Sequence, residues 1–137
     1  MNNKSETTVE KLSPRVAFSE SIEKLAQENP EITIITSDTS GSTKTTNFAE
    51  KFPEQFVEVG IAEQNAVGIG AGLAIAGKVP FVCGHACFYS ARVVEQIKND
   101  VIYSDLNVTI IGASGGLSYS QLGATHHSLH DIATFRG

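Results

Sequence analysis

Tryptophan is absent from this 137-residue chain, and cysteine and basic residues are scarce. The two cysteines, Cys83 and Cys87, are too few for a disulfide framework, so a reducing cytoplasm fits best. Lysine and arginine number 10 against 15 acidic residues, and the net charge of −5 argues against binding to a nucleic-acid backbone. We therefore expect a cytoplasmic protein with no nucleic-acid partner.

Long hydrophobic runs are also missing. Residues 1–12 are polar and contain no apolar core of a signal peptide. The apolar, uncharged stretch over residues 64–77 is too short and too rich in glycine to span a bilayer, so we expect no membrane contact. Hydrophobic residues still make up 41% of the chain and charged residues only 18%, which is typical of a globular protein. We predict a flexible leader over residues 1–12 and one domain over residues 13–137.

Short β-branched segments alternate with helical segments along this domain. The predicted strands cover residues 31–36, 56–59, 79–83 and 107–111, and the predicted helices cover residues 13–29, 47–51, 62–76, 91–100 and 128–135. In the first helix Ser13 is the expected N-cap and Pro14 the first helical residue, with Val16, Ile22, Leu25 and Ala26 as its apolar stripe. This alternation predicts an α/β fold, a mostly parallel sheet with helices on both faces. Because the chain stops just after a helix, we expect a domain that is incomplete or a sheet completed by another chain.

Three glycines lie within the predicted helix 62–76, at Gly68, Gly70 and Gly72. They do not form a dinucleotide-binding loop, because Leu73 stands where the third glycine belongs and the run lies inside a helix. We expect a buried helix whose three glycines allow close backbone packing.

The chemically unusual residues fall where the predicted strands end. Ligands of open parallel sheets bind beyond the carboxyl ends of the strands, and the segments 38–43, 60–63, 84–89 and 113–126 lie there. Glu63 opens an otherwise uncharged helix, where an acid is favoured by the helix dipole. Its apolar neighbours indicate burial, however, and a buried carboxylate is a candidate functional group.

The histidines and cysteines allow two interpretations. The sets Cys83, His85, Cys87 and His126, His127, His130 contain zinc-ligand residue types, but neither has the paired spacing of a structural zinc site. We therefore expect no metal ligands in this chain. His126 ends a long glycine-rich loop near a strand end, where an imidazole can transfer protons.

Four segments give residues 15–136 a resemblance to the pyrimidine-binding domain of transketolases, above all to the separate C-terminal subunits of split transketolases. They are residues 37–43, 59–68, 80–96 and 123–126. The second contains Gly-Ile-Ala-Glu-Gln-Asn, a pattern specific to thiamine-diphosphate enzymes of this superfamily and shared in outline by pyruvate-dehydrogenase-type beta subunits. The closing Gly-Ala-Thr-His favours the transketolase and deoxyxylulose-phosphate synthase branch.

The resemblance implies thiamine diphosphate as cofactor and a role for each matching residue. Glu63 matches the glutamate that hydrogen-bonds N1′ of the aminopyrimidine ring and favours the tautomer that removes the thiazolium C2 proton. Phe88 matches an aromatic residue that packs on the pyrimidine, and His85 stands where the family usually has another aromatic residue. Asp38 matches an acid near the positively charged thiazolium.

The same resemblance places the sugar substrate. Arg15 and Ser42 match residues that hold the sugar phosphate, and His126 matches a histidine that contacts substrate oxygens. Ser114 stands where the family has a histidine that contacts the donor sugar. Leu122 stands where the family has an acid that hydrogen-bonds a hydroxyl of the acceptor sugar. These departures imply either a sugar other than the usual pentose phosphates or weak binding of the sugar.

The family motif that holds Mg²⁺ and diphosphate, Gly-Asp-Gly followed by asparagine, does not occur in residues 1–137. The resemblance therefore implies an N-terminal partner subunit that binds both, in a homodimer or heterotetramer. The implied activity is transfer of a two-carbon ketol unit between sugar phosphates or related sugars, within that complex only. Two alternatives remain: a part like deoxyxylulose-phosphate synthase or a 2-oxoacid dehydrogenase beta subunit, and a non-catalytic assembly domain of the same fold.

Overall fold

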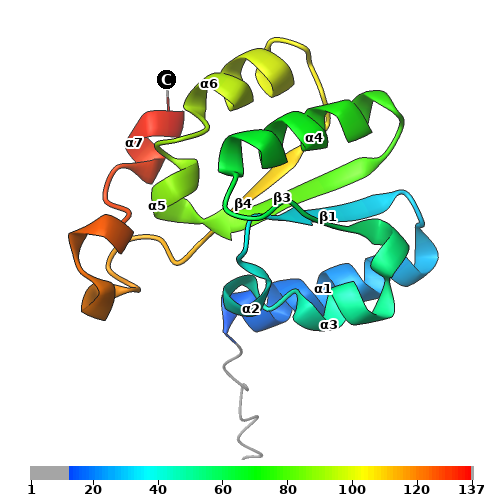
Figure 1. Ribbon diagram of the computed structural model, residues 1–137, viewed down its shortest axis with the longest axis horizontal. Helices are drawn as coiled ribbons and strands as arrows, with labels where there is room; N and C mark the ends of the chain where they lie inside the picture. The colour runs from blue at the N-terminus through cyan, green and yellow to red at the C-terminus, as the bar shows by residue number, and fades with distance from the viewer. Residues whose placement is uncertain (1–12, 137) are drawn as a thin grey trace, which may run out of the picture.

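Four parallel strands form a single sheet in the order β2-β1-β3-β4 (Figure 1). The computed structural model describes residues 13–136, so the predicted leader over residues 1–12 lies outside the described residues. The strands are β1 (Ile32–Thr36), β2 (Phe56–Glu58), β3 (Val79–His85) and β4 (Thr109–Ala113). All four predicted strands are present, with bounds shifted by up to two residues.

Helices cover both faces of the sheet, as Figure 1 shows, with α1 and α3 on one face and α4 and α6 on the other. The helices are α1 (Pro14–Glu28), α2 (Ser40–Thr43), α3 (Thr46–Lys51), α4 (Glu63–Ile75), α5 (Ala86–Tyr89), α6 (Val94–Gln96) and α7 (Asp131–Phe135). Four further helical turns are η1 (Pro53–Gln55), the π-helical η2 (Ile97–Ile102), η3 (Ser120–Leu122) and η4 (Ala124–His126). The predicted α/β class is confirmed. Among the described residues, no helix is long and apolar enough to cross a membrane.

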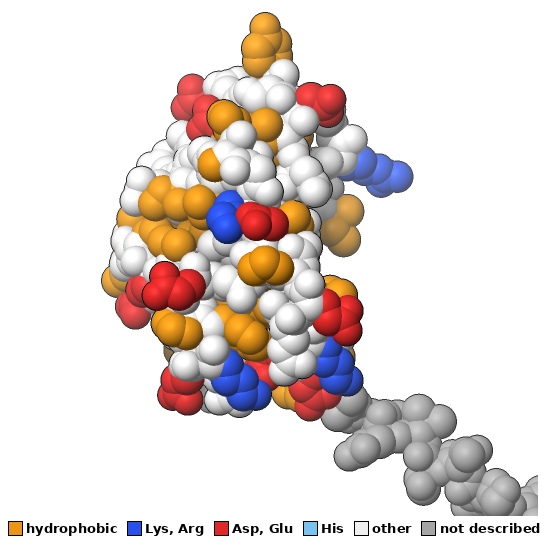
Figure 2. Space-filling model, turned by 90° about the vertical axis from the view of Figure 1, so that its right-hand side faces the viewer, with side chains coloured by type: hydrophobic (Ala, Val, Ile, Leu, Met, Phe, Trp, Pro, Cys, Tyr) orange, Lys and Arg blue, Asp and Glu red, His pale blue; other side chains and the backbone are white. Residues whose placement is uncertain are grey.

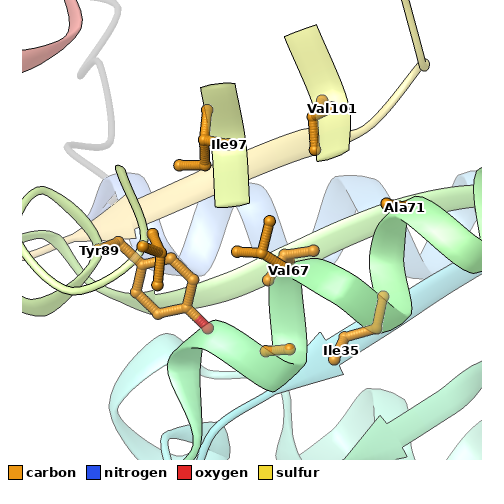
Figure 3. Packing of buried hydrophobic residues seen from close by; sticks show 9 residues of the cluster. Ile35, Val67, Ala71, Tyr89, Ile97 and Val101 are labelled. Carbon is orange, nitrogen blue, oxygen red and sulfur yellow. The ribbon is translucent and has the colours of Figure 1, made fainter. Parts of the chain in front are cut away.

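The core consists of one hydrophobic cluster on each face of the sheet. Successive residues of a strand point to opposite faces, so Ile34 and Ile35 of β1 belong to different clusters. One cluster contains Ile35, Ala66, Val67, Ala71, Val82, Tyr89, Val93, Ile97 and Val101 (Figure 3). The other contains Ile22, Ala26, Ile32, Ile34, Phe48 and Cys83. All five residues of β1 are buried, as is usual for a parallel strand covered on both sides.

Of the three glycines at which close packing of α4 was predicted, only Gly70 lies close to the sheet. A Cβ atom on Gly70 would lie 2.7 Å from Cγ2 of Val82, whereas a Cβ atom on Gly68 or Gly72 would meet nothing within 4 Å. The prediction of a buried helix with close packing at all three glycines is therefore wrong for Gly68 and Gly72. The reason is that α4 packs on the sheet along one face only, and Gly68 and Gly72 lie on its exposed face.

The first predicted helix begins as expected, but its buried face differs. α1 starts at Pro14 after Ser13, whose side chain makes no capping hydrogen bond. Leu25 is exposed, and Ser19 is buried with Ile22 and Ala26. A serine is tolerated there because its hydroxyl donates a hydrogen bond to the carbonyl oxygen of Lys44.

Two other predicted helices begin three residues late. Helix 91–100 starts at Val94 and continues through the π-helical turn to Ile102, with Val93 buried and Val94 only half-buried. The helix predicted over residues 128–135 starts at Asp131, because Ser128 forms a β-bridge with Gly116.

Figure 2 shows the end of the molecule at the right of Figure 1, where the strands begin. Acidic and basic side chains are scattered there among hydrophobic ones. One ion pair joins the segments that precede β1 and β3, with Nζ of Lys78 2.7 Å from Oε2 of Glu31, and both side chains are exposed. The residues considered for function lie at the opposite end of the sheet.

Candidate active site

The four segments predicted to carry ligands meet at one edge of the sheet. All strands are parallel, so their carboxyl ends lie together, and the chain leaves β1 and β3 in opposite directions toward β2 and β4. Such a switch in direction between neighbouring strands opens a crevice, the usual ligand site of this architecture. Here the hydroxyl of Thr39, after β1, donates to the carbonyl oxygen of Cys83 in β3, at 3.2 Å.

Glu63 is buried, as its apolar neighbours indicate. It is the first residue of α4 and only 6% exposed. Nη1 of Arg92 lies 2.7 Å from its Oε1 and donates a hydrogen bond to it. A carboxylate removed from water needs such a charged partner, because an unpaired one loses its hydration without compensation.

Four aromatic rings form a cluster beside this ion pair. His85 and Phe88 come from the end of β3 and from α5, while Tyr119 and His126 come from the loop after β4. The centroid of His85 lies 5.8 Å from Phe88, 5.0 Å from Tyr119 and 6.2 Å from His126. His126 lies 5.3 Å from Phe88 and 6.1 Å from Tyr119, and all these contacts are edge-to-face, a favourable geometry for aromatic pairs.

The two predicted phosphate-binding residues, Arg15 and Ser42, are linked to this cluster through His85. Nη1 of Arg15, on α1, donates to the carbonyl oxygen of Ser42 at 2.9 Å. The hydroxyl of Ser42 lies 3.4 Å from Nε2 of His85. The other ring nitrogen, Nδ1 of His85, is buried and has no hydrogen-bond partner within residues 13–136. This orphan nitrogen marks a place where a ligand atom would be accommodated.

The pKa of His85 is held below its usual value of 6.5. Burial of the ring is the main cause, followed by the nearby positive charges of His126 and Arg15, while Glu63 opposes the shift. His85 is therefore a neutral imidazole at pH 7.

We expect His85 to make the folded chain less stable in mild acid. The unfolded chain takes up this proton near pH 6.5, whereas the folded chain takes it up only at lower pH, so stability falls as the pH drops below 6.5. His85→Phe removes this group and should reduce the loss between pH 7.5 and pH 5.5. Urea unfolding at both values measures it, and an equal loss in both proteins would contradict the assignment.

Two predicted residues are not linked to the cluster. Asp38 and Ser114 both adopt the left-handed backbone conformation, with φ of 55° and 61°. Among the described residues, neither side chain makes a hydrogen bond or ring contact with the other predicted site residues. The structure thus connects Arg15, Ser42, His85, Phe88 and His126, and brings Glu63 to Phe88 through Arg92.

Glu58, which the sequence analysis did not single out, joins two of the loops at the site. Its Oε1 accepts hydrogen bonds from the backbone N–H groups of Asp38, at 2.7 Å, and Gly60, at 2.9 Å. Its Oε2 accepts a hydrogen bond from the hydroxyl of Thr36 at 2.6 Å. One carboxylate at the end of β2 therefore holds the turn after β1 and the turn that leads to Glu63. Nothing in the strand pattern distinguished it from an ordinary solvent-facing acid.

Arg92 and Tyr119 were also missed, although each had a sequence signal. Arg92 follows Phe88 by four residues, the spacing that places two side chains on one face of a helical turn. Its Cζ atom lies 4.3 Å from the Phe88 ring centroid. Tyr119 is the one aromatic residue in the glycine-rich loop 112–123.

The two cysteines are not available as thiolates. Burial raises the pKa of Cys83 to about 12, and burial also raises the pKa of Cys87 above its usual value. Within residues 13–136, no group of three His, Cys, Asp or Glu side chains could hold a metal ion.

Comparison with known proteins gives consistent matches. The family model described as "Transketolase, pyrimidine binding domain" matches residues 10–137. Over 89% of this chain, 56% of residues are identical to one subunit of the apulose-4-phosphate transketolase of Phocaeicola vulgatus, and the match covers 39% of that subunit. A 1-deoxy-D-xylulose-5-phosphate synthase of Desulfitobacterium hafniense is 39% identical over 87% of this chain and 18% of its own length.

A solved structure extends the similarity to three dimensions. A split-gene transketolase, described as an inactive beta4 tetramer, superimposes with a TM-score of 0.76 and 43% identity. The match covers 89% of this chain and 38% of that one. The chain thus spans well under half the length of the relatives that it matches.

Proposed function

This chain belongs to the transketolase family, because it matches the pyrimidine-binding domain of that family, and we propose that it forms the pyrimidine-binding half of a thiamine-diphosphate site. Members of this family use thiamine diphosphate. We propose further that the assembled protein transfers a two-carbon ketol unit between sugar phosphates or related sugars. The observation that carries the proposal is the buried carboxylate of Glu63, which Arg92 links to the ring of Phe88.

The residues present fit an aminopyrimidine ring. Oε1 of Glu63 is occupied by Arg92, and Oε2 accepts no hydrogen bond from the described residues. Oε2 is therefore the atom available to a ring nitrogen. Phe88 supplies an aromatic surface, and the unpartnered Nδ1 of His85 is a further polar contact. Asp38 would lie near the positively charged thiazolium.

When bound, thiamine diphosphate supplies the carbanion chemistry that breaks and remakes a carbon–carbon bond next to a ketone. Glu63 would hold a proton at Oε2 toward N1′ of the pyrimidine. Nδ1 of His126 lies 3.0 Å from the hydroxyl of Thr125, so its Nε2 is the nitrogen left for a substrate oxygen. We propose Glu63 and His126 as the catalytic residues of this chain.

Arg15 and Ser42 would bind the phosphate end of the sugar. One guanidinium nitrogen of Arg15 is engaged with the Ser42 carbonyl, and the remaining N–H groups can form charge-assisted hydrogen bonds to phosphate oxygens. The Ser42 hydroxyl, beside His85, is a further donor. Ser114 would lie at the donor end of the sugar.

We propose that a diphosphate-binding partner subunit, carrying Mg²⁺, completes the site in a homodimer or heterotetramer. Calorimetry tests this directly. Without a partner, the chain is expected to give no micromolar binding of thiamine diphosphate with Mg²⁺, because residues 13–136 offer no three-residue metal cluster. With the partner, tight binding is expected. Micromolar binding by the chain alone would contradict the half-site proposal.

The sugar is expected to differ from the usual pentose phosphates. Leu122 offers no hydrogen-bond acceptor to a sugar hydroxyl. An unpaired buried hydroxyl costs about 1–3 kcal/mol, which corresponds to a kcat/KM that is lower by about 5- to 150-fold. In this chain Leu122 is 53% exposed, so the penalty applies once a partner covers it. Ser114→His with Leu122→Asp is expected to raise kcat/KM for xylulose 5-phosphate and ribose 5-phosphate. Histidine is among the residues tolerated at the left-handed φ of position 114.

Apulose 4-phosphate, which the name of the Phocaeicola vulgatus relative specifies, is the first sugar to compare. If the unaltered complex already uses the pentose phosphates at ordinary efficiency, the interpretation of Ser114 and Leu122 is wrong.

The similarity to deoxyxylulose-phosphate synthase favours one second candidate, condensation of a pyruvate-derived unit with a sugar phosphate. The identity of the donor separates the two functions. A complex that consumes pyruvate with release of carbon dioxide, and not a ketose, would favour the second.

A further inference from the structure

We propose that Arg92 is a positioning residue that holds Glu63 and Phe88 in the arrangement needed for the pyrimidine ring. This inference rests on the proposed function. Arg92 belongs neither to the predicted catalytic residues nor to the predicted cofactor-binding residues. Its side chain, however, contacts both Glu63 and Phe88.

The local backbone places Arg92 over the ring. α5 ends at Tyr89, and the chain continues as a helical turn in which the N–H of Arg92 donates to the carbonyl oxygen of Phe88 at 2.8 Å. The Arg92 side chain then returns across the Phe88 ring, with Cζ 4.3 Å from the ring centroid. A planar guanidinium is suited to this stacking, because its flat face matches the aromatic surface.

From this position the guanidinium fixes the carboxylate. Nη1 donates to Oε1 of Glu63, which leaves Oε2 as the oxygen without a partner among residues 13–136. A free carboxylate rotates about its terminal torsion and presents either oxygen, since that torsion is broad. The contact from Arg92 removes this freedom, so that one oxygen is held and the other is reserved for a ligand.

This ion pair differs from the two others found among residues 13–136. Lys78–Glu31 joins side chains that are 38% and 48% exposed, and Lys51–Glu23 joins a lysine that is 57% exposed to a glutamate that is 14% exposed. In the Arg92–Glu63 pair the carboxylate side chain is only 7% exposed while the arginine is 49% exposed. Exposed pairs contribute little, whereas loss of the partner of a buried charge has large consequences.

The test measures the affinity of the assembled complex for thiamine diphosphate with Mg²⁺ by calorimetry. Arg92→Met keeps the apolar stem and removes the guanidinium, so the affinity is expected to fall by about 10- to 100-fold, the range seen when a residue that orients a binding group is lost. Arg92→Lys keeps the charge without the planar fork and is expected to recover part of the loss. Lys78→Met, which breaks the exposed pair at the other end of the sheet, is the matched control and should bind as the unaltered complex does.

A double-mutant cycle shows whether Arg92 acts through Glu63. In a Glu63→Ala background, Arg92→Met is expected to cause little further loss of affinity, because the side chain that Arg92 orients is gone. Urea unfolding of each cofactor-free variant gives a readout that does not depend on the cofactor and verifies that the fold persists.

The outcomes separate the two proposals. If the unaltered complex does not bind thiamine diphosphate, the proposed function is wrong. If it binds and Arg92→Met binds equally well, Arg92 is not a positioning residue. If Arg92→Met lowers the affinity as much in the Glu63→Ala background as in the unaltered complex, Arg92 acts independently of Glu63 and the inference is overturned.

Discussion

Glu63→Gln is expected to abolish exchange of the C2 proton of thiamine diphosphate bound to the assembled complex while leaving the fold intact. Glutamine has the shape of glutamate, and its carbonyl oxygen still accepts the hydrogen bond from Arg92. It cannot hold an acidic proton toward N1′ of the pyrimidine. General acid–base groups contribute roughly 100- to 10,000-fold, and a loss of this size is expected here. Proton NMR of acid-quenched samples in deuterated water measures the exchange rate.

The matched control for this variant is Glu31→Gln. Glu31 pairs with Lys78 in an exposed ion pair at the other end of the sheet, so the same chemical change there should leave exchange unaffected. If Glu63→Gln exchanges as fast as the unaltered complex, Glu63 is only an acid favoured by the helix dipole. The alternative of a non-catalytic assembly domain would then gain support.

Gly84→Ala is expected to destabilise the chain more than any other single methyl addition considered for it. A Cβ atom at Gly84, in β3, would lie 2.1 Å from Cε2 and 2.9 Å from Cδ2 of Tyr89. The Tyr89 ring cannot move away easily, because it is buried in the core and its hydroxyl lies 3.1 Å from that of Ser37. Overpacking of a core costs about 1–3 kcal/mol and occasionally more, and we expect the upper end or beyond. Urea unfolding measures the change in the free energy of unfolding.

Gly68→Ala is the control, since it adds the same methyl group on the exposed face of α4, where nothing lies within 4 Å. Alanine is favoured over glycine in a helix, so a gain of about 0.5–1 kcal/mol is expected. Equal stability of the Gly84→Ala variant and the unaltered chain would show that Tyr89 has room to move.

Much of the fold was predictable because strong local patterns agree with the tertiary structure. The run of β-branched residues after Pro30 is typical of a short strand, and it forms β1, an inner strand with every residue buried. The glycines of α4 were less predictable, because sequence does not tell which face of a helix meets the sheet. Only Gly70 faces Val82, so the other two have no packing role.

The candidate site was predictable where a residue type carries the chemistry and not where geometry alone does. Glu63 and His126 stand out by type and position, and Phe88 through the family resemblance. Glu58 does not, because its importance comes from three hydrogen bonds that depend on the pairing of β1 with β2. Arg92 meets Glu63 across 29 residues of chain, a contact that exists only after α4 and β3 have packed together.

The three hydrogen bonds of Glu58 also determine which part of the site can open independently of the core. Among the strands of residues 13–136, β2 is an edge strand of three residues that pairs with β1 alone, and none of its residues is fully buried. Segments with few buried contacts unfold locally at a lower free energy than the rest of a domain. Because one carboxylate on this strand holds the turns at Asp38 and Gly60, fraying of β2 releases both turns in one event. The region around Glu63 is therefore coupled to the least protected strand of the sheet, whereas His85 and Phe88 belong to the inner strand β3 and to α5, which follows it.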